Sequence, residues 1–178
     1  LMSRDVVPLI VGGCPSRTGS AFPVVNPATE EVIAEVASAD SALSLKALGA
    51  AEQAFRAWSR ATLAERRAVI LEYAASLERH KGHLIELLIA ETGKPYDNAE
   101  YDFDMLVTCL RFFVEEAARV RQEVIFDPQG RFHNYLLRQP LGVVVGFLAW
   151  NFPLLNRGYK LGPVLASGCT AVIKPSRH

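Results

Sequence analysis

The side-chain amide of residue 151 is the feature of this sequence best suited to chemistry. Asn151 follows a continuous apolar run, LGVVVGFLAW at 141–150, and precedes Phe152 and Pro153. Such a run is typical of a parallel strand buried on both faces, and ligands of open α/β sheets bind beyond the carboxyl ends of such strands. An amide there can donate a hydrogen bond to an oxygen that gains negative charge during a reaction. Asparagine is also a favoured helix N-cap, so a purely structural role stays open, and the two roles can also coexist.

The sequence after this amide predicts a helix. Pro153 suits the first helical turn, the helix runs to about Ala166, and Gly168 stops it. Four residues share one face of this helix by their spacing: Phe152, Leu155, Asn156 and Tyr159. An aromatic stripe is more often part of a core than the wall of a ligand tunnel. However, the amide and the hydroxyl in it need polar partners if they are buried. Both interpretations stay open.

A second apolar strand, TAVIK at 170–174, completes a strand–helix–strand unit. Lys174 at its carboxyl end can reach a nucleotide hydroxyl or phosphate, or can be an ordinary surface lysine. The sequence contains neither a G-x-G-x-x-G fingerprint nor a P-loop. Pattern alone therefore predicts an α/β domain without naming its ligand.

The sequence upstream predicts the elements that must position this unit. Residues up to about 37 indicate short strands and turns, and helices follow as far as about Arg121. The helix ends are predicted from caps and breakers: Ser38 or Asp40, the Thr62–Glu65 capping box, a bend at 80–82, Gly93 with Pro95, and Asp97 with Glu100. A strand at 123–126, a turn at 127–130 and an extended segment at 131–140 come next. The mixed faces of that last segment suggest an extension toward a partner.

Composition excludes several classes of protein. The 178 residues carry 19 basic and 19 acidic side chains, so no basic excess indicates a nucleic-acid partner. The longest apolar stretch is about half of a membrane span, so no membrane partner is expected. Cys14, Cys109 and Cys169 form no C-x-x-C pair or Cys/His cluster, which predicts no metal site and three reduced thiols in the cytoplasm. The leucine ahead of Met2 suggests an upstream start or a fragment.

Several segments resemble the aldehyde dehydrogenase superfamily, in the family's order and over essentially the whole chain. The stretch GVVVGFLAWNFPLLNRGYKLGPVLASGCTAVIKPS at 142–176 is similar to the family's run from "GVV…PWNFP" to "KPS". Three further segments resemble family motifs: FPVVNPATEEVIAEV at 22–36, ETGKP at 91–95 and RQPLGVV at 138–144. One motif alone would be weak, but several in one order are highly specific.

The resemblance implies a role for each matching residue. Asn151 would be catalytic, its amide stabilising the oxyanion of the thiohemiacetal. NAD or NADP would contact residues around the two strand ends: Phe147, Leu148, Trp150, Lys174, Ser176 and Arg177. The aldehyde tunnel would be lined by Phe152, Leu155, Asn156 and Tyr159, with Lys160 nearby.

The resemblance also implies a fold and partners. The fold class is α/β, with a partial Rossmann-like parallel sheet, an N-terminal helical layer and an extended β oligomerisation arm. Residues 1–121 would be the N-terminal strands and helices of the cofactor-binding domain, 122–140 the β-arm of the oligomerisation domain, and 141–178 the first, incomplete βαβ unit of the nucleotide-binding sheet. The expected partners are a small-molecule aldehyde and, in the intact protein, further copies of the same chain.

Family chemistry needs a cysteine thiolate that attacks the aldehyde and a glutamate that activates water, both downstream of "KPS". None of the three cysteines occupies the nucleophile motif. The chain is therefore expected to be an N-terminal fragment that is inactive alone. The alternatives are a non-catalytic truncated paralogue that associates with other aldehyde dehydrogenase chains, and a plain nucleotide-binding module.

Two positions depart from the family pattern. Ala149 stands where the family commonly has proline before the tryptophan, which should alter only a local turn. Arg177 stands where many NAD-preferring members carry a glutamate that holds the ribose hydroxyls. Losing that acid would relieve repulsion of a 2′-phosphate, and the arginine would attract one, which suggests use of NADP.

Overall fold

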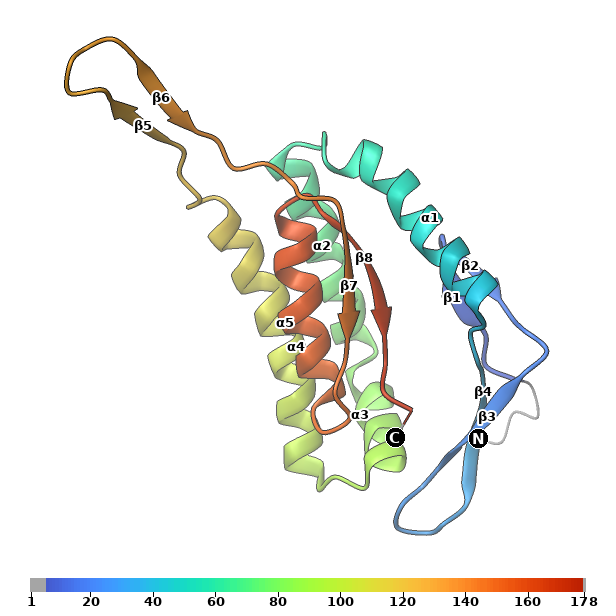
Figure 1. Ribbon diagram of the computed structural model, residues 1–178. Helices are drawn as coiled ribbons and strands as arrows, with labels where there is room; N and C mark the ends of the chain where they lie inside the picture. The colour runs from blue at the N-terminus through green and yellow to red at the C-terminus, as the bar shows by residue number, and fades with distance from the viewer. Residues whose placement is uncertain (1–5, 178) are drawn as a thin grey trace.

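The computed structural model describes residues 6–177, which form an α/β arrangement (Figure 1). The expectation of an upstream start or a fragment rested on Met2 and the residue before it, and both lie outside the described residues. The helices are α1 Ser41–Trp58, α2 Leu63–Arg79, α3 Lys81–Thr92, α4 Tyr96–Ala117 and α5 Pro153–Ala166. The strands are β1 Leu9–Val11, β2 Cys14–Ser16, β3 Ala21–Val25, β4 Val32–Ala37, β5 Glu123–Phe126, β6 His133–Leu136, β7 Val143–Phe147 and β8 Thr170–Lys174.

The strands pair two by two along the chain. β1 with β2, β3 with β4, and β5 with β6 are antiparallel, whereas β7 and β8 are parallel. The parallel pair is joined through α5, so it is the predicted strand–helix–strand unit.

Most helix boundaries follow the predicted local signals. Asp40, and not Ser38, is the N-cap of α1, and its Oδ1 accepts a hydrogen bond from the Leu43 amide at 2.7 Å. The capping box that opens α2 is present as predicted. The bend at 80–82 separates α2 from α3, and Gly93 ends α3 in the left-handed conformation at φ 69°.

The predicted ends of α4 were wrong. Pro95 is the N-cap of this helix and no side chain caps it, so Asp97 lies in the first turn and does not open the helix. The Pro95 carbonyl accepts hydrogen bonds from the amides of residues 98 and 99, which starts the helix earlier. At the other end α4 stops at Ala117, short of Arg121, because the next amides bond three residues back and tighten the last turn.

The hydrophobic core lies between α2, α3, α4 and α5. Its largest fully buried side chains are Phe103, Ile70, Ile85, Leu106, Leu110 and Val114. α4 and α5 pack closely because two glycines of α5 face α4. A Cβ on Gly158 would lie 3.0 Å from the Leu106 Cα, and one on Gly162 would lie 3.3 Å from the Cys109 carbonyl oxygen. These glycines let the two backbones approach each other.

The strand β7 is less buried than its sequence predicts. Val145 is 45% exposed and Phe147 is 68% exposed, so the expectation of burial on both faces was wrong for this chain. Gly146 points toward Ile173 and Lys160, on the side of α5. β7 pairs with β8 alone among the described strands, and α1 packs mainly against β8. Alternate side chains of β7 therefore stay open to solvent.

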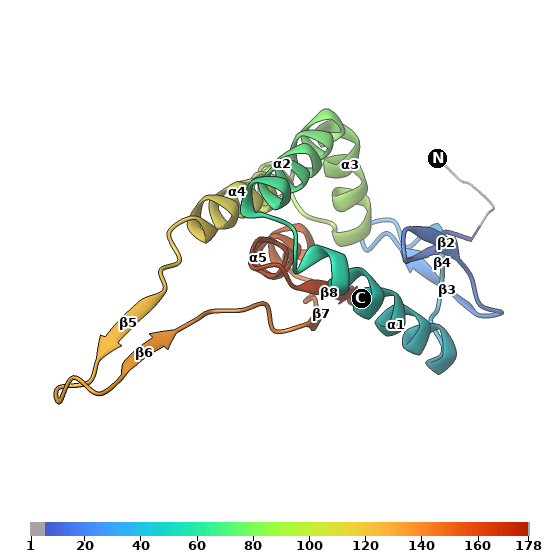
Figure 2. The ribbon, with the colours of Figure 1, turned by 90° about the horizontal axis from the view of Figure 1, so that it is seen from above.

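The hairpin of β5 and β6 projects from the helical body as an arm in both views (Figures 1 and 2). Every residue of the two strands is exposed. Its turn is held by Arg131, whose guanidinium donates to Asp127 at 3.0 Å and holds the pKa of that carboxyl below its ordinary value. Several exposed side chains of the arm are large and apolar: Val124, Ile125, Phe126, Phe132, Tyr135, Leu136 and Leu137.

Side chains of other helices hold the carboxyl end of α5. The indole nitrogen of Trp58 donates to the Leu165 carbonyl at 3.1 Å, and Nε of Arg66 donates to the Ala166 carbonyl at 3.2 Å. The last carbonyls of a helix have no partner within it, and a cation there interacts favourably with the helix dipole. The last residue of α1 and the first turn of α2 thus act as a C-terminal cap for α5.

Candidate active site

The two predicted strand ends meet at one edge of the parallel pair. Phe147 lies opposite Lys174 in register, and the Leu148 amide donates to the Lys174 carbonyl at 3.0 Å. The loop that leads into α5 and the segment after β8 therefore begin side by side, at the end of the strands away from the arm (Figure 1). This is the edge at which open α/β proteins bind ligands.

Asn151 lies exposed in the loop between β7 and α5. Phe152 is the N-cap of α5, and the first helical hydrogen bond runs from the Asn156 amide to the Phe152 carbonyl at 2.9 Å. The interpretation of Asn151 as a helix cap is therefore wrong. Its side-chain amide has no hydrogen-bond partner among residues 6–177, so it is available to a bound molecule.

A buried ion pair lies directly behind this loop. Asp102 of α4 is fully buried, its Oδ1 accepts a hydrogen bond from the Leu155 amide at 2.7 Å, and its Oδ2 lies 2.6 Å from Nζ of Lys94. The same ammonium lies 4.0 Å from the centroid of the Phe152 ring. Sequence reasoning missed both residues, because nothing local marks an aspartate 53 positions away as the partner of α5.

The stripe on α5 is only partly buried. Phe152, Leu155 and Asn156 are partly buried, whereas Tyr159 is exposed. Phe147 and Tyr159 line one hollow of about 380 Å³ between β7 and α5, together with Lys160. The structure thus brings together a predicted cofactor residue and a predicted tunnel residue.

The remaining predicted site residues surround the same edge. Leu148 is buried, and Trp150 is exposed. Nζ of Lys174 donates to the Pro175 carbonyl at 2.9 Å, and Ser176 is partly buried. The guanidinium of Arg177 lies 5.0 Å from the centroid of the Phe22 ring, a cation–π contact that joins the last described residue to β3.

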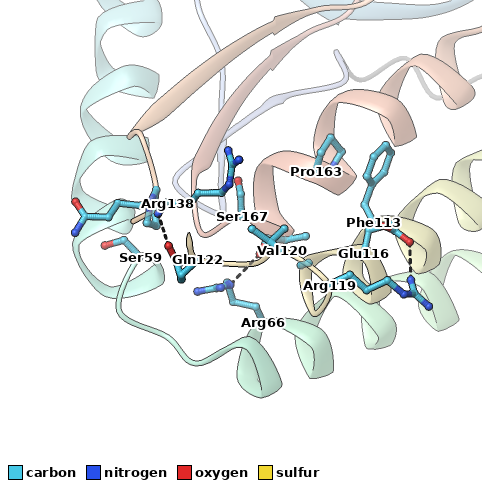
Figure 3. Close-up of a pocket in the computed structure, with 14 residues that line it drawn as sticks. Ser59, Arg66, Phe113, Glu116, Arg119, Val120, Gln122, Arg138, Pro163 and Ser167 are labelled. Atoms are coloured by element: carbon cyan, nitrogen blue, oxygen red, sulfur yellow. Dashed lines mark hydrogen bonds and ion pairs between the residues drawn. The ribbon is translucent and has the colours of Figure 1, made fainter. Parts of the chain in front are cut away.

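Another hollow lies at the opposite end of the parallel pair (Figure 3). It has a volume of about 670 Å³ and is lined by residues 138–140 before β7 and by Ser167 before β8. Figure 3 shows that Arg66 reaches into it from α2 and that the Gln122 side chain bonds to the backbone of Arg138. Because this hollow lies at the amino ends of the strands, it is not the candidate site.

Further observations bound the chemistry of the described chain. Cys14 is exposed, whereas Cys109 and Cys169 are buried, and burial raises the pKa of the Cys109 thiol. No group of three histidine, cysteine or acidic residues in the part of the chain that the structure describes is arranged to hold a metal ion. None of the helices between residues 6 and 177 is long and apolar enough to cross a membrane.

The fold and this edge define a class: an α/β protein with a parallel strand pair and a polar loop at the strands' carboxyl ends. Comparison with known sequences identifies the family within this class. The model of the aldehyde dehydrogenase family matches residues 14–178, and the chain belongs to that family. The resemblance predicted from the sequence motifs, and the α/β fold that it implied, are thereby confirmed.

Individual relatives and solved structures are similar to this chain over most of its length. The chain is 37% identical over 163 residues to a chloroplastic betaine aldehyde dehydrogenase of Beta vulgaris, covering 87% of this chain and 33% of the relative. It superposes on the crystal structure of an NADP dependent enzyme of E. coli with a TM-score of 0.92 at 29% identity, covering 96% of this chain and 36% of the other. For PnpE in complex with nicotinamide adenine dinucleotide the TM-score is 0.90 at 35% identity, covering 95% and 35%. The chain spans about a third of the length of the curated relatives it matches.

Proposed function

We propose that residues 1–178 form the N-terminal third of an NAD(P)-dependent aldehyde dehydrogenase that oxidises an aldehyde to a carboxylic acid. The observation that carries the proposal is the amide of Asn151, exposed and unengaged at the carboxyl end of β7. The family match over residues 14–178 and the third of each relative that the chain covers support it.

In this proposal Asn151 donates a hydrogen bond to the oxygen that becomes negative when a thiolate attacks the aldehyde carbon. The nucleophilic cysteine and the glutamate that activates water belong to other parts of the intact enzyme. When bound, NAD or NADP supplies the hydride acceptor for the oxidation. The loop residue thus stabilises charge and takes no part in bond making.

Substitution of the amide tests this role. Asn151→Ala in the intact enzyme should lower kcat by about 10²- to 10³-fold, the usual effect of removing one oxyanion donor. Asn98, an exposed asparagine in the first turn of α4, provides a matched control. Asn98→Ala should leave kcat unchanged. If Asn151→Ala keeps its turnover, Asn151 is not the oxyanion donor.

The cofactor is proposed to bind along the edge where the two strands end. Its contacts are assigned to Phe147, Leu148, Trp150, Lys174, Ser176 and Arg177. The in-register pairing of Phe147 with Lys174 supports this assignment, because it gathers both segments at one edge. Calorimetric titration of the intact enzyme with NAD and NADP tests it, and Lys174→Ala should weaken the binding of both.

Arg177 is proposed to favour NADP over NAD. The contact with Phe22 holds its guanidinium beside the edge, where a 2′-phosphate would be attracted by the charge. Arg177→Glu in the intact enzyme should lower the ratio of kcat/KM for NADP to that for NAD by at least about tenfold. The same change at Arg17, an exposed arginine in the N-terminal segment, should leave the ratio unchanged. A strong NAD preference before any substitution would remove this assignment.

The substrate is proposed to be a small aldehyde that passes along one face of α5. Phe152, Leu155, Asn156 and Tyr159 are assigned to that tunnel, and the exposure of Tyr159 supports an open path on this face. Asn156→Leu should raise KM for oxygenated aldehydes more than KM for aliphatic aldehydes. Equal changes for both kinds of aldehyde would remove Asn156 from the tunnel.

Residues 122–140 are proposed to be an oligomerisation arm, residues 1–121 part of the cofactor-binding domain, and residues 141–178 the first unit of its sheet. The exposed apolar side chains of the arm support self-association, because a long apolar edge rarely stays open to water. Phe126→Lys should shift the sedimenting species toward the monomer. Leu45→Lys is the control, because Leu45 of α1 is 68% exposed and Phe126 is 67% exposed. An unchanged assembly in Phe126→Lys would exclude the arm.

The same arm supports a second candidate, a non-catalytic chain that associates with other aldehyde dehydrogenase chains. Residues 1–178 expressed alone should produce no NADH or NADPH from an aldehyde in either case. Co-expression with an intact family member separates the two, since only the second candidate requires a stable mixed assembly.

We also propose a cytoplasmic location, which the three free thiols support and cell fractionation tests.

A further inference from the structure

The amino end of α5 lacks the local cap that its sequence offers. Phe152 at the N-cap has no side-chain oxygen, and Asn151, a good capping residue, lies one position too early. Pro153 has no amide hydrogen, so the first turn leaves the amides of residues 154 and 155 without a partner inside the helix. An acceptor from elsewhere in the fold is therefore needed.

Asp102 supplies that acceptor from α4. Its buried carboxylate takes the Leu155 amide at 2.7 Å, the place where a local N-cap side chain would act. A negative charge at a helix amino end is also favoured by the helix dipole. A carboxylate with no solvent exposure needs a counter-charge, and Lys94 provides one at 2.6 Å.

The ion pair also reaches the loop itself. Nζ of Lys94 lies over the face of the Phe152 ring, the residue next to Asn151. On the other side of the loop, the Leu148 amide is fixed to β8 through the Lys174 carbonyl. The segment 149–151 is thus held at both ends. Backbone pairing of Leu148 with β8 holds one end, and the ion pair of Lys94 and Asp102 holds the other.

We propose that Lys94 and Asp102 act as positioning residues for catalysis: they cap α5 from outside, and this keeps the amide of Asn151 free for the reacting oxygen. The inference rests on the proposed role of Asn151. Without the carboxylate, α5 would gain its cap by starting one residue earlier with Asn151 as the N-cap. Its Oδ1 would then accept a hydrogen bond from the first turn, and this orientation would carry the Nδ2 donor away from the substrate.

A paired substitution tests the cap without leaving a charge buried alone. Asp102→Ala with Lys94→Met removes both charges together, a change that ion pairs often tolerate. Hydrogen exchange at the Leu155 amide should accelerate by about 10- to 100-fold, with core amides of α4 unaffected. The control is Asp104→Asn on the same helix, where the exposed carboxylate pairs with Lys81 at 2.8 Å. It should leave exchange at Leu155 unchanged.

A more conservative pair of substitutions should restore the protection of the Leu155 amide. Asp102→Asn with Lys94→Met keeps one side-chain oxygen for the Leu155 amide but carries no charge. Exchange at Leu155 should return most of the way to the unsubstituted rate, and this variant also serves if the alanine variant fails to fold. Equal exchange at Leu155 in the asparagine variant, the alanine variant and the unsubstituted protein would overturn the capping role.

Kinetics of the intact enzyme test the link to catalysis. The alanine–methionine variant should lower kcat by about 10- to 100-fold while the KM for NAD(P) stays within about twofold. Added to Asn151→Ala, it should cost less than about twofold more, since the amide is already gone. Faster exchange with unchanged kcat would overturn the positioning role. If Asn151→Ala alone leaves kcat unchanged, the proposed function fails, whereas the exchange result still decides the cap.

Discussion

Replacing Gly158 by alanine should destabilise the protein through the close contact of α4 with α5. The added Cβ would lie 3.0 Å from the Leu106 Cα, 3.1 Å from the Leu106 carbonyl oxygen and 3.0 Å from the Cys109 Cβ. Two of these atoms belong to backbone and cannot rotate away, so the cost falls in the upper part of the overpacking range, about 2–3 kcal/mol. Alanine recovers about 1 kcal/mol of helix propensity. The free energy of unfolding should therefore fall by about 1–2 kcal/mol.

Urea denaturation followed by circular dichroism measures this change, provided that the slope with urea concentration stays constant. Gly49 in α1 gives the matched control, because a Cβ there meets no atom within 4 Å. Gly49→Ala should raise the free energy of unfolding by about 0.5–1 kcal/mol. The two substitutions therefore have opposite signs. A Gly158→Ala protein as stable as the unsubstituted one would show that α4 and α5 are not in backbone contact.

Two further outcomes follow from single side chains. Hydrogen bonds from the backbone and side chain of Thr62 hold the pKa of Glu65 below its ordinary value of 4.5. The stabilisation by this carboxylate is present above the unfolded pKa and is lost as pH falls through the lower folded pKa. Glu65→Gln should thus flatten the acid side of a plot of thermal midpoint against pH, and an unaltered acid side would count against the capping box. A thiol reagent should label Cys14 in the native protein, and Cys109 and Cys169 only after urea unfolding. Rapid native labelling of a buried thiol would contradict the packing of α4 or of the turn before β8.

The elements that the sequence predicted well are those whose signals lie within a few residues. The capping box of Thr62 and Glu65, the Asp40 cap and the left-handed Gly93 are each read from neighbouring positions. The parallel pairing of β7 with β8 followed from two apolar runs around one helix. Such signals place the loop of Asn151 at a strand end without knowledge of the rest of the fold.

The elements that the sequence could not predict depend on distant partners. Asn151 is a better local cap than Phe152, yet α5 starts later because Asp102, 53 positions away, takes the Leu155 amide. The exposure of Val145 and Phe147 was missed for a related reason, since burial of a strand depends on which strands and helices cover it. Local propensity indicates which helix starts and strand burials are favourable, and tertiary contacts determine which of them forms.

The cap at the carboxyl end of α5 has a consequence for how the chain acquires its structure. The bonds from Trp58 to Leu165 and from Arg66 to Ala166 span 107 and 100 positions, and Thr170 of β8 reaches back 119 positions to the Ala51 carbonyl. During synthesis on the ribosome, α1 and α2 emerge long before the segment that they grip. Until that segment is made, the donors on Trp58 and Arg66 are bonded to water. Closing these large loops is entropically costly. Among residues 6–177, the docking of α1 is therefore complete only once the βαβ unit has formed.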